Sequence, residues 1–160
     1  IEAGVPVVGI CFGHQLMAQA LGGRVEKSDR GWGVGLHTYE IIEQAPFMGE
    51  AAGQRITCAV SHQDQVVALP DGAVRLGGSP FCPNGILSYA GGMGLSFQMH
   101  PEFTHEFAAA LLALRSDRIP GEVVALAQPS LAHGSDRDTM AEWIAGFLNG
   151  LSPSRGEENG

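Results

Sequence analysis

The amino-acid sequence predicts an α/β fold with a mixed β-sheet, and three features of the chain lead to this prediction. An apolar run at 5–10 indicates a buried strand, which continues into a helical segment at 16–21 that stops at two glycines. Strand-like segments separated by turn-forming residues follow as far as position 99. From Thr104 onward, the spacing of the apolar residues becomes helical.

The middle of the chain predicts short strands joined by turns. The expected strands contain Val25 and the segments 33–42, 55–60, 74–78, 85–90 and 93–99, with a turn or short helix at 46–52. The Pro-Asp-Gly sequence at 70–72 is a turn signal, and the glycines before Met93 make a hairpin-like link. Strands joined so closely pair antiparallel, whereas the strand at 5–10 leads into a helix, so we expect a mixed sheet.

The last third of the chain predicts two helices. Thr104 is placed to cap a helix that ends near Pro120, and its inner side is expected to carry Phe107, Leu111, Leu112 and Leu114. A second helix follows Asp136, and its core-facing residues are expected to be Met140, Trp143, Ile144, Phe147 and Leu148. We expect one domain over 1–150 and a flexible polar tail over 151–160.

The composition limits the classes of partner and cofactor. A net charge of −8 argues against a nucleic-acid surface and against binding to anionic membranes. No apolar run approaches the roughly 18 residues that span a bilayer, so we expect a cytoplasmic protein. Three cysteines without a C-x-x-C pair give neither a disulfide framework nor a zinc site, and Cys58 and Cys82 are expected to be ordinary core residues. The sequence predicts no metal and no cofactor.

The most informative segment is the turn around Cys11, which lies between the first strand and the first helix. Gly9 and Gly13 flank it in a G-x-C-x-G pattern, and small neighbours are what a nucleophile on a tight strand-to-helix turn requires. The helix N-terminus behind the thiol favours the thiolate and offers backbone N–H groups to an oxyanion. The alternative is a structural cysteine beside a glycine-rich turn.

A candidate base for this cysteine follows 89 residues later, in the sequence His100-Pro101-Glu102. His100 is suited to exchange a proton with the thiol and with a leaving amine. Glu102 is suited to orient the imidazole and to stabilise its cation. Pro101 disfavours helix at the preceding residue, so both side chains can project from the end of a strand. The alternative is an incidental His-Glu pair in a surface loop.

These motifs together resemble the class I glutamine amidotransferases, which carry a Cys-His-Glu triad. The resemblance rests on Cys-Phe-Gly-His-Gln at 11–15, His-Pro-Glu at 100–102, Gly-Trp-Gly at 31–33 and Ser-His-Gln-Asp-Gln-Val at 61–66. Within that family, the similarity is greatest to the stand-alone GMP-synthase-like branch and to related γ-glutamyl peptidases. The resemblance implies a three-layer, flavodoxin-like fold whose mixed sheet is mostly parallel.

The resemblance also implies a reaction and a set of site residues. The reaction is cleavage of a γ-carboxamide through a γ-glutamyl thioester on Cys11, with His100 and Glu102 completing the triad. By position, the glutamyl group would be contacted by Gln15, Ser61, His62 and Gln63. The backbone N–H of Phe12 would be half of an oxyanion hole. Asp64 would either recognise the substrate's α-amino group or cap a turn.

The resemblance further implies that the domain lacks an N-terminal part. Members of the family place several strands ahead of the cysteine, so we expect the first strands of the sheet to be missing from this chain. Released ammonia would pass to an acceptor on a separate synthetase subunit. The alternatives are a stand-alone γ-glutamyl peptidase that acts on γ-glutamyl peptides or conjugates, and a non-catalytic binding or regulatory module.

Overall fold

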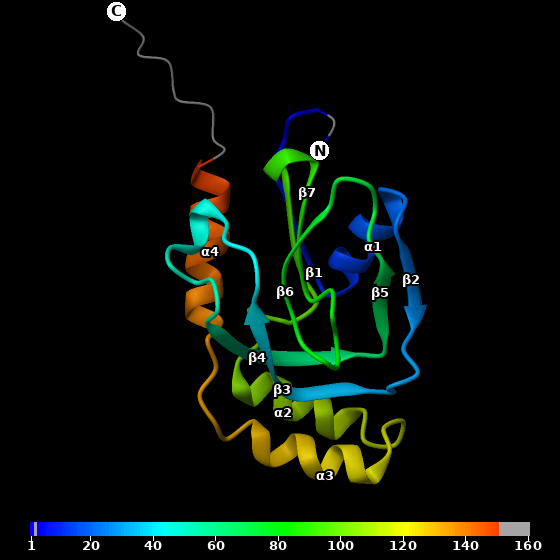
Figure 1. Ribbon diagram of the computed structural model, residues 1–160. Helices are drawn as coiled ribbons and strands as arrows, with labels where there is room; N and C mark the ends of the chain where they lie inside the picture. Colours follow the sequence, from blue (N-terminus) through cyan, green and yellow to red (C-terminus); the bar gives the residue numbers. More distant parts are fainter. Residues whose placement is uncertain (2, 151–160) are drawn as a thin grey trace, which may run out of the picture.

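The structure is a computed structural model that describes Ile1 and residues 3–150 (Figure 1). The tail expected at 151–160 lies outside the described residues. The strands are β1 (Val7–Ile10), β2 (Arg24–Lys27), β3 (Gly33–Ile41), β4 (Arg55–His62), β5 (Asp64–Ala68), β6 (Val74–Gly78), β7 (Ile86–Tyr89) and β8 (Gly94–Phe97). The helices are α1 (Phe12–Ala20), α2 (His105–Leu114), α3 (Gly121–Ser130) and α4 (Arg137–Gly150), with single turns of 3-10 helix at Pro46–Met48 and Ala90–Gly92.

The main sheet has six strands in the order β1-β8-β7-β6-β3-β4, and β2 pairs with β5 in a separate ribbon. Within the six-stranded sheet, β1 and β8 are parallel and every other neighbouring pair is antiparallel. The α/β class and the mixed sheet are therefore confirmed, but the expectation of a mostly parallel sheet is wrong. The reason is the short connections from β6 through β8, because a parallel pair needs a long crossover between its strands.

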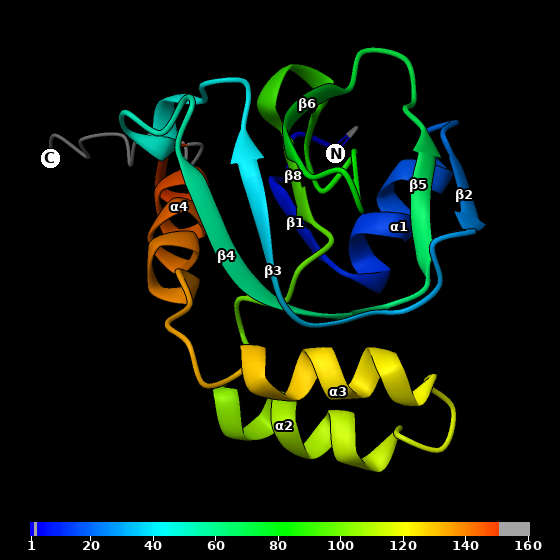
Figure 2. The same ribbon diagram turned by 60° about the horizontal axis from the view of Figure 1, so that its bottom comes forward.

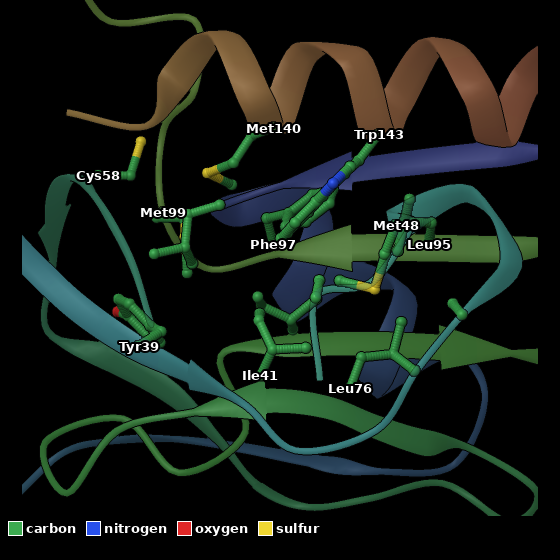
Figure 3. Packing of buried hydrophobic residues seen from close by; sticks show 14 of the residues in the cluster. Tyr39, Ile41, Met48, Cys58, Leu76, Leu95, Phe97, Met99, Met140 and Trp143 are labelled. Atoms are coloured by element: carbon green, nitrogen blue, oxygen red, sulfur yellow. The ribbon is translucent and has the colours of Figure 1, made fainter. Parts of the chain in front are cut away.

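Helices cover both faces of the sheet, which is the middle of three layers (Figure 1). On one face, Met140, Trp143 and Phe147 of α4 pack into a cluster with Phe97 and Met99 (Figure 3). On the other face, α1 packs through Ala18 against a cluster of Val66, Leu87 and Tyr89. Strand β7 contributes to both clusters, Ile86 to the first and Leu87 and Tyr89 to the second, because successive side chains of a strand alternate between its two faces.

The helix expected from Thr104 to near Pro120 is shorter than predicted, and the helix α3 that follows Pro120 was not expected. Thr104 caps α2 as expected, since its Oγ1 accepts a hydrogen bond of 3.2 Å from the backbone N–H of Phe107. However, α2 ends at Leu114, and Pro120 is the N-cap residue of α3. The expected inner face is partly wrong as well: Leu112 is buried, whereas Leu114 is 79% exposed and Phe107 is 51% exposed. Helices α2 and α3 lie side by side across the ends of β3 and β4 (Figure 2).

Replacing Gly9 by alanine is expected to lower the free energy of unfolding by about 1–3 kcal/mol, because the added methyl group overpacks a closed contact. Its Cβ would lie 2.8 Å from the backbone carbonyl of Gly13, where α1 crosses β1. Gly13→Ala is the matched control, since a Cβ there meets nothing within 4 Å, and alanine favours helix. Urea denaturation of both variants measures this difference, and equal stability would show that α1 and β1 are not in close contact.

Candidate active site

Cys11 occupies a strained turn between β1 and α1. Its backbone has φ 48° and ψ −98°, a region that side-chain-bearing residues rarely adopt and that costs about 1–3 kcal/mol. Two backbone hydrogen bonds hold the turn: Cys11 N–H donates to Phe97 O at 2.8 Å, and Gln15 N–H donates to Cys11 O at 3.1 Å. The expected strand-to-helix elbow is therefore present, with the cysteine at its apex.

The parallel pairing of β1 with β8 brings the two sequence motifs together. Ile10 lies opposite Phe97, so both strands end at the same edge of the sheet. Cys11 comes directly after β1, and His100 lies three residues beyond the end of β8. The two side chains are thereby close enough for Cys11 to raise the pKa of the His100 imidazole. The 89 residues that separate the motifs in sequence are bridged by this one pairing.

The imidazole of His100 is held from several directions. Its Nδ1 lies 2.6 Å from Glu102 Oε1, and its ring stacks on Phe103 with centroids 3.9 Å apart and planes 9° from parallel. Its backbone N–H donates to Ala59 O at 2.8 Å, which ties this segment to β4. These contacts fix both the position and the plane of the ring, and they leave the other ring nitrogen for Cys11.

The electrostatics of the pair favour a charged imidazole. Burial by itself lowers the pKa of His100, but hydrogen bonds and charge interactions with Cys11 and Glu102 outweigh it and raise that pKa to about 9. Burial raises the pKa of Glu102, but the hydrogen bond from His100, a backbone hydrogen bond and the charge of His100 together outweigh burial and lower the pKa overall. At neutral pH the arrangement is therefore an imidazolium beside a carboxylate.

A cavity of about 340 Å³ opens beside the thiol, at the lower end of the size range of small-molecule sites. Its lining residues are Cys11, Gln15, Trp32, Ser61, His62, Gln63, Asp64, Arg115 and Arg118. The four residues predicted to contact a glutamyl group thus surround one cavity. Phe12, predicted to contribute its backbone N–H to an oxyanion hole, is not among the lining residues, and its side chain is 71% exposed on the first turn of α1.

The polar side chains of this cavity are held in fixed orientations. Gln15 donates from Nε2 to Asp64 O at 2.8 Å and to Gln98 Oε1 at 3.3 Å. His62 Nδ1 lies 3.1 Å from the same Asp64 O. Burial lowers the pKa of His62 to about 4, so at neutral pH its ring is uncharged and donates its Nδ1 proton to that carbonyl.

Behind the elbow lies a second buried polar cluster. His14 on α1 is fully buried, and its Nδ1 lies 2.7 Å from the hydroxyl of Ser96. The hydroxyl of Tyr89 lies 2.9 Å from that same oxygen. Burial, together with repulsion from His62, lowers the pKa of His14 to about 3, so this ring is neutral. The cluster fastens α1 to β7 and β8 directly behind the cysteine.

The sequence analysis missed Gln98, which lies beneath the thiol. Its side chain is completely buried, and its Nε2 donates to Cys11 Sγ at 3.6 Å while its Oε1 accepts from Gln15. One signal was available: Gln98 precedes His100 by two residues, and alternate residues of an extended segment share a face. Arg115 was also missed, because nothing in the sequence fixes how the C-terminal end of α2 faces the cavity.

Replacing Gln98 by leucine is expected to slow the alkylation of Cys11 by iodoacetamide at pH 7 by roughly 10- to 100-fold. The change removes a donor to the sulfur of Cys11, and it leaves the amide of Gln15 without one of its two acceptors. An unchanged alkylation rate would contradict the assignment of Gln98 as a positioning residue. Gln54→Leu, on the exposed surface, is the control.

The other two cysteines differ from Cys11 in their surroundings. Cys58 and Cys82 are buried, and burial raises the pKa of each thiol to about 12. Within residues 1 and 3–150, no group of three or more His, Cys, Asp or Glu side chains is arranged to hold a metal ion. In the same part of the chain, no helix is long and apolar enough to cross a membrane.

Comparisons with known proteins identify the family. A family model described as glutamine amidotransferase class-I matches residues 1–114. The chain is 35% identical over 122 residues to a subunit of the glutamine-hydrolyzing GMP synthase of Methanoculleus marisnigri, covering 76% of this chain and 65% of that protein. It is also 35% identical over 147 residues to the glutamine-hydrolyzing GMP synthase of Brucella melitensis, covering 89% of this chain and 28% of that protein.

Solved structures show the same fold. A glutamine amido transferase from Methylobacillus flagellatus matches with a TM-score of 0.76 at 20% identity, covering 99% of this chain and 68% of that one. A glutamine amidotransferase from Thermotoga maritima matches with a TM-score of 0.71 at 21% identity, covering 94% and 64%. The chain thus spans about two thirds of the length of several proteins it matches, and about a quarter of the Brucella protein. It belongs to the class-I glutamine amidotransferase family.

Proposed function

We propose that this protein hydrolyses the γ-carboxamide of glutamine, with Cys11 as nucleophile, His100 as general acid and base, and Glu102 as the group that orients His100. The observation that carries the proposal is a cysteine on a strained elbow, beside a histidine whose pKa the cysteine raises and whose Nδ1 is held by a carboxylate. This is the arrangement of nucleophile, base and orienting group that covalent acyl transfer requires.

The reaction proceeds in two steps. The Cys11 thiolate attacks the γ-carbonyl carbon, the carbon–nitrogen bond breaks, and the proton held by His100 leaves with ammonia. In the second step His100 takes a proton from water, the resulting hydroxide attacks the thioester, and glutamate departs as the thiolate is regenerated. The backbone N–H of Phe12 is our candidate oxyanion donor, because the first N–H groups of a helix have no intrahelical acceptor.

The cavity beside the thiol supports a glutamyl substrate. Ser61, His62 and Gln63 line it at the end of β4, and Gln15 lines it from α1. Its volume of about 340 Å³ suits a small molecule. We assign these four residues to the glutamyl group, with the leaving ammonia on the side of His100.

We propose that the ammonia is used by a synthetase subunit in the cytoplasm. The support is the relative from Methanoculleus marisnigri, which is named as one subunit of a glutamine-hydrolyzing GMP synthase. Glutamine is then the substrate, and the synthetase is a separate chain. A γ-glutamyl peptidase would use the same triad without such a partner, so the test must separate the two activities.

The test compares ammonia release from L-glutamine with cleavage of γ-glutamylalanine by the full chain. We expect glutamate and ammonia in equal amounts from glutamine, and at least tenfold lower kcat/KM for the dipeptide. A preference for the dipeptide would contradict the amidotransferase proposal and indicate a γ-glutamyl peptidase. Turnover of neither substrate would indicate a non-catalytic module.

A further inference from the structure

The cavity beside Cys11 contains an unpaired cation. Arg115 follows α2 as its C-cap residue, its side chain is half-buried, and it lines the cavity together with Cys11. Among residues 1 and 3–150, no carboxylate lies within ion-pair distance of its guanidinium group. This is unexpected in a chain with 17 acidic and nine basic residues. A partly desolvated cation without a counter-ion is costly unless an anion occupies the space beside it.

The hydrogen bond of the Arg115 side chain to Ser61 also indicates a place for an anion beside it. Arg115 Nη1 donates to Ser61 Oγ at 2.8 Å. A serine hydroxyl has one proton, and because its oxygen here accepts from arginine, that proton is free to donate elsewhere. The remaining N–H groups of the guanidinium and the hydroxyl of Ser61 therefore form a set of donors at one end of the cavity. A carboxylate, which has only acceptor atoms, fits such a set.

The charges that line the cavity agree with this geometry. Arg118, on the turn after α2, adds a second cation at an exposed position, where its Nε lies 4.0 Å from Asp117 Oδ2. Asp64 is the single acidic residue among the lining residues, and His62 is neutral. With Arg118 paired to Asp117, Arg115 is the cation of the lining that has no acidic partner within the described residues, in a chain that as a whole carries −8. An α-amino acid zwitterion, with its carboxylate toward Arg115 and its ammonium toward Asp64, matches this distribution.

We infer that Arg115, with Ser61, binds the α-carboxylate of the γ-glutamyl substrate. The inference rests on the proposed function, because the ligand is the glutamyl group whose amide Cys11 attacks. It narrows the substrate class to γ-glutamyl amides with a free α-carboxylate. Peptides that end in glutamine keep that carboxylate, whereas internal glutamine residues of a protein lack it and are excluded.

The test compares two amides that differ in this carboxylate alone. L-Glutamine carries it, and 4-aminobutanamide keeps the amide and the amine but lacks it. In Arg115→Met, we expect KM for glutamine to rise roughly 10- to 100-fold, as for loss of a charge-assisted hydrogen bond, with a smaller change in kcat. The specificity constant measured with the carboxylate-free amide should change less than twofold, so that the preference for glutamine collapses. For Arg115→Lys, we expect a KM for glutamine between those of the unmodified chain and of Arg115→Met, because lysine keeps the charge without the planar guanidinium.

Arg75→Met is the matched control, since Arg75 is exposed and outside this cavity. It should leave the KM values for both amides unchanged. An equal loss on both amides in Arg115→Met would indicate a structural role for Arg115 and overturn the inference. An unchanged KM for glutamine in that variant would overturn it as well.

A second readout separates this inference from the proposed function. L-Glutamate should protect Cys11 from alkylation by iodoacetamide better than 4-aminobutyrate, and the difference should disappear in Arg115→Met. This protection needs no turnover. If it is present in a chain that fails to hydrolyse glutamine, the carboxylate site is supported and the proposed amidase activity is contradicted. Equal protection by both compounds in the unmodified chain would reject the carboxylate site itself.

Discussion

Cys11→Ser is expected to abolish amide cleavage, with a loss on the order of 10⁴- to 10⁶-fold in kcat. A serine hydroxyl is a far weaker nucleophile than the sulfur of a cysteine. The fold should be retained, because the new side chain is nearly isosteric and Gln98 can donate to its oxygen as it does to Sγ. Ammonia release from glutamine and urea denaturation measure the two quantities.

Cys58→Ala is the matched control for this prediction. Cys58 is a buried member of the main hydrophobic cluster, so its replacement should lower stability and leave turnover of the folded protein near normal. Cys11→Ser should therefore lose activity and keep its stability, whereas Cys58→Ala should lose stability and keep its activity. Retained hydrolysis in Cys11→Ser would end the triad account, because no other thiol lines the cavity.

His100→Ala is expected to lose activity by about 10⁴-fold or more, and Glu102→Ala by less. His100 exchanges protons with the reacting groups, whereas Glu102 acts through its hydrogen bond of 2.6 Å to Nδ1. The stacking of Phe103 on the imidazole should preserve part of the ring's orientation when the carboxylate is gone. Steady-state kinetics measure both losses, and equal losses would mean that Glu102 also maintains the local structure.

The same pair predicts a pH-dependent contribution to stability. The pKa of His100 is raised to about 9. Its contribution to the free energy of unfolding is therefore complete below about pH 6.5 and is lost as the pH rises through 9. The lowered pKa of Glu102 gives a share that is present above about pH 4.5 and lost in more acidic solution. Urea denaturation should therefore show Glu102→Gln to be destabilised most near pH 5.5. A difference that is larger at pH 9.5 would contradict this assignment.

Much of the fold follows from local patterns in the sequence. The elbow at Cys11, the long strand β3 and most of the core face of α4 are set by short-range periodicity and by glycines. The exception on α4 is Leu148, which was expected to face the core and is 38% exposed. The direction of the strands is different, because it depends on which strands become neighbours. Only the hairpin-like link before β8 indicated antiparallel pairing, and the family resemblance favoured the opposite.

The C-terminal helices show a second limit. Pro120 was interpreted as the end of a helix, yet proline is equally suited to the first positions of the next one, and α3 begins there. The exposure of Leu114 has a related cause: α2 packs through Leu112, and its rotation about its axis is set by contacts with β3, β4 and α3. Such contacts are tertiary, so a count of apolar residues does not reveal them.

The candidate site shows the same difference between what local patterns predict and what tertiary contacts decide. The residues of the two motifs were found because their residue types have a chemical meaning together, and the structure places Cys11 and His100 at the same edge of the sheet. Gln98 and Arg115 carry no motif of their own. Their positions beneath and beside the thiol arise from the pairing of β1 with β8 and from the packing of α2 against β4. Sequence alone therefore indicated the reacting groups better than the groups that surround them.

The most direct test of the triad account is covalent labelling with a glutamine-mimicking diazoketone, read by intact mass and peptide mapping. We expect a single adduct, located on Cys11 and prevented by excess L-glutamine, because burial keeps the thiols of Cys58 and Cys82 protonated. His100→Ala should slow the labelling strongly. Absence of an adduct on Cys11, or an adduct that glutamine does not prevent, would contradict the account.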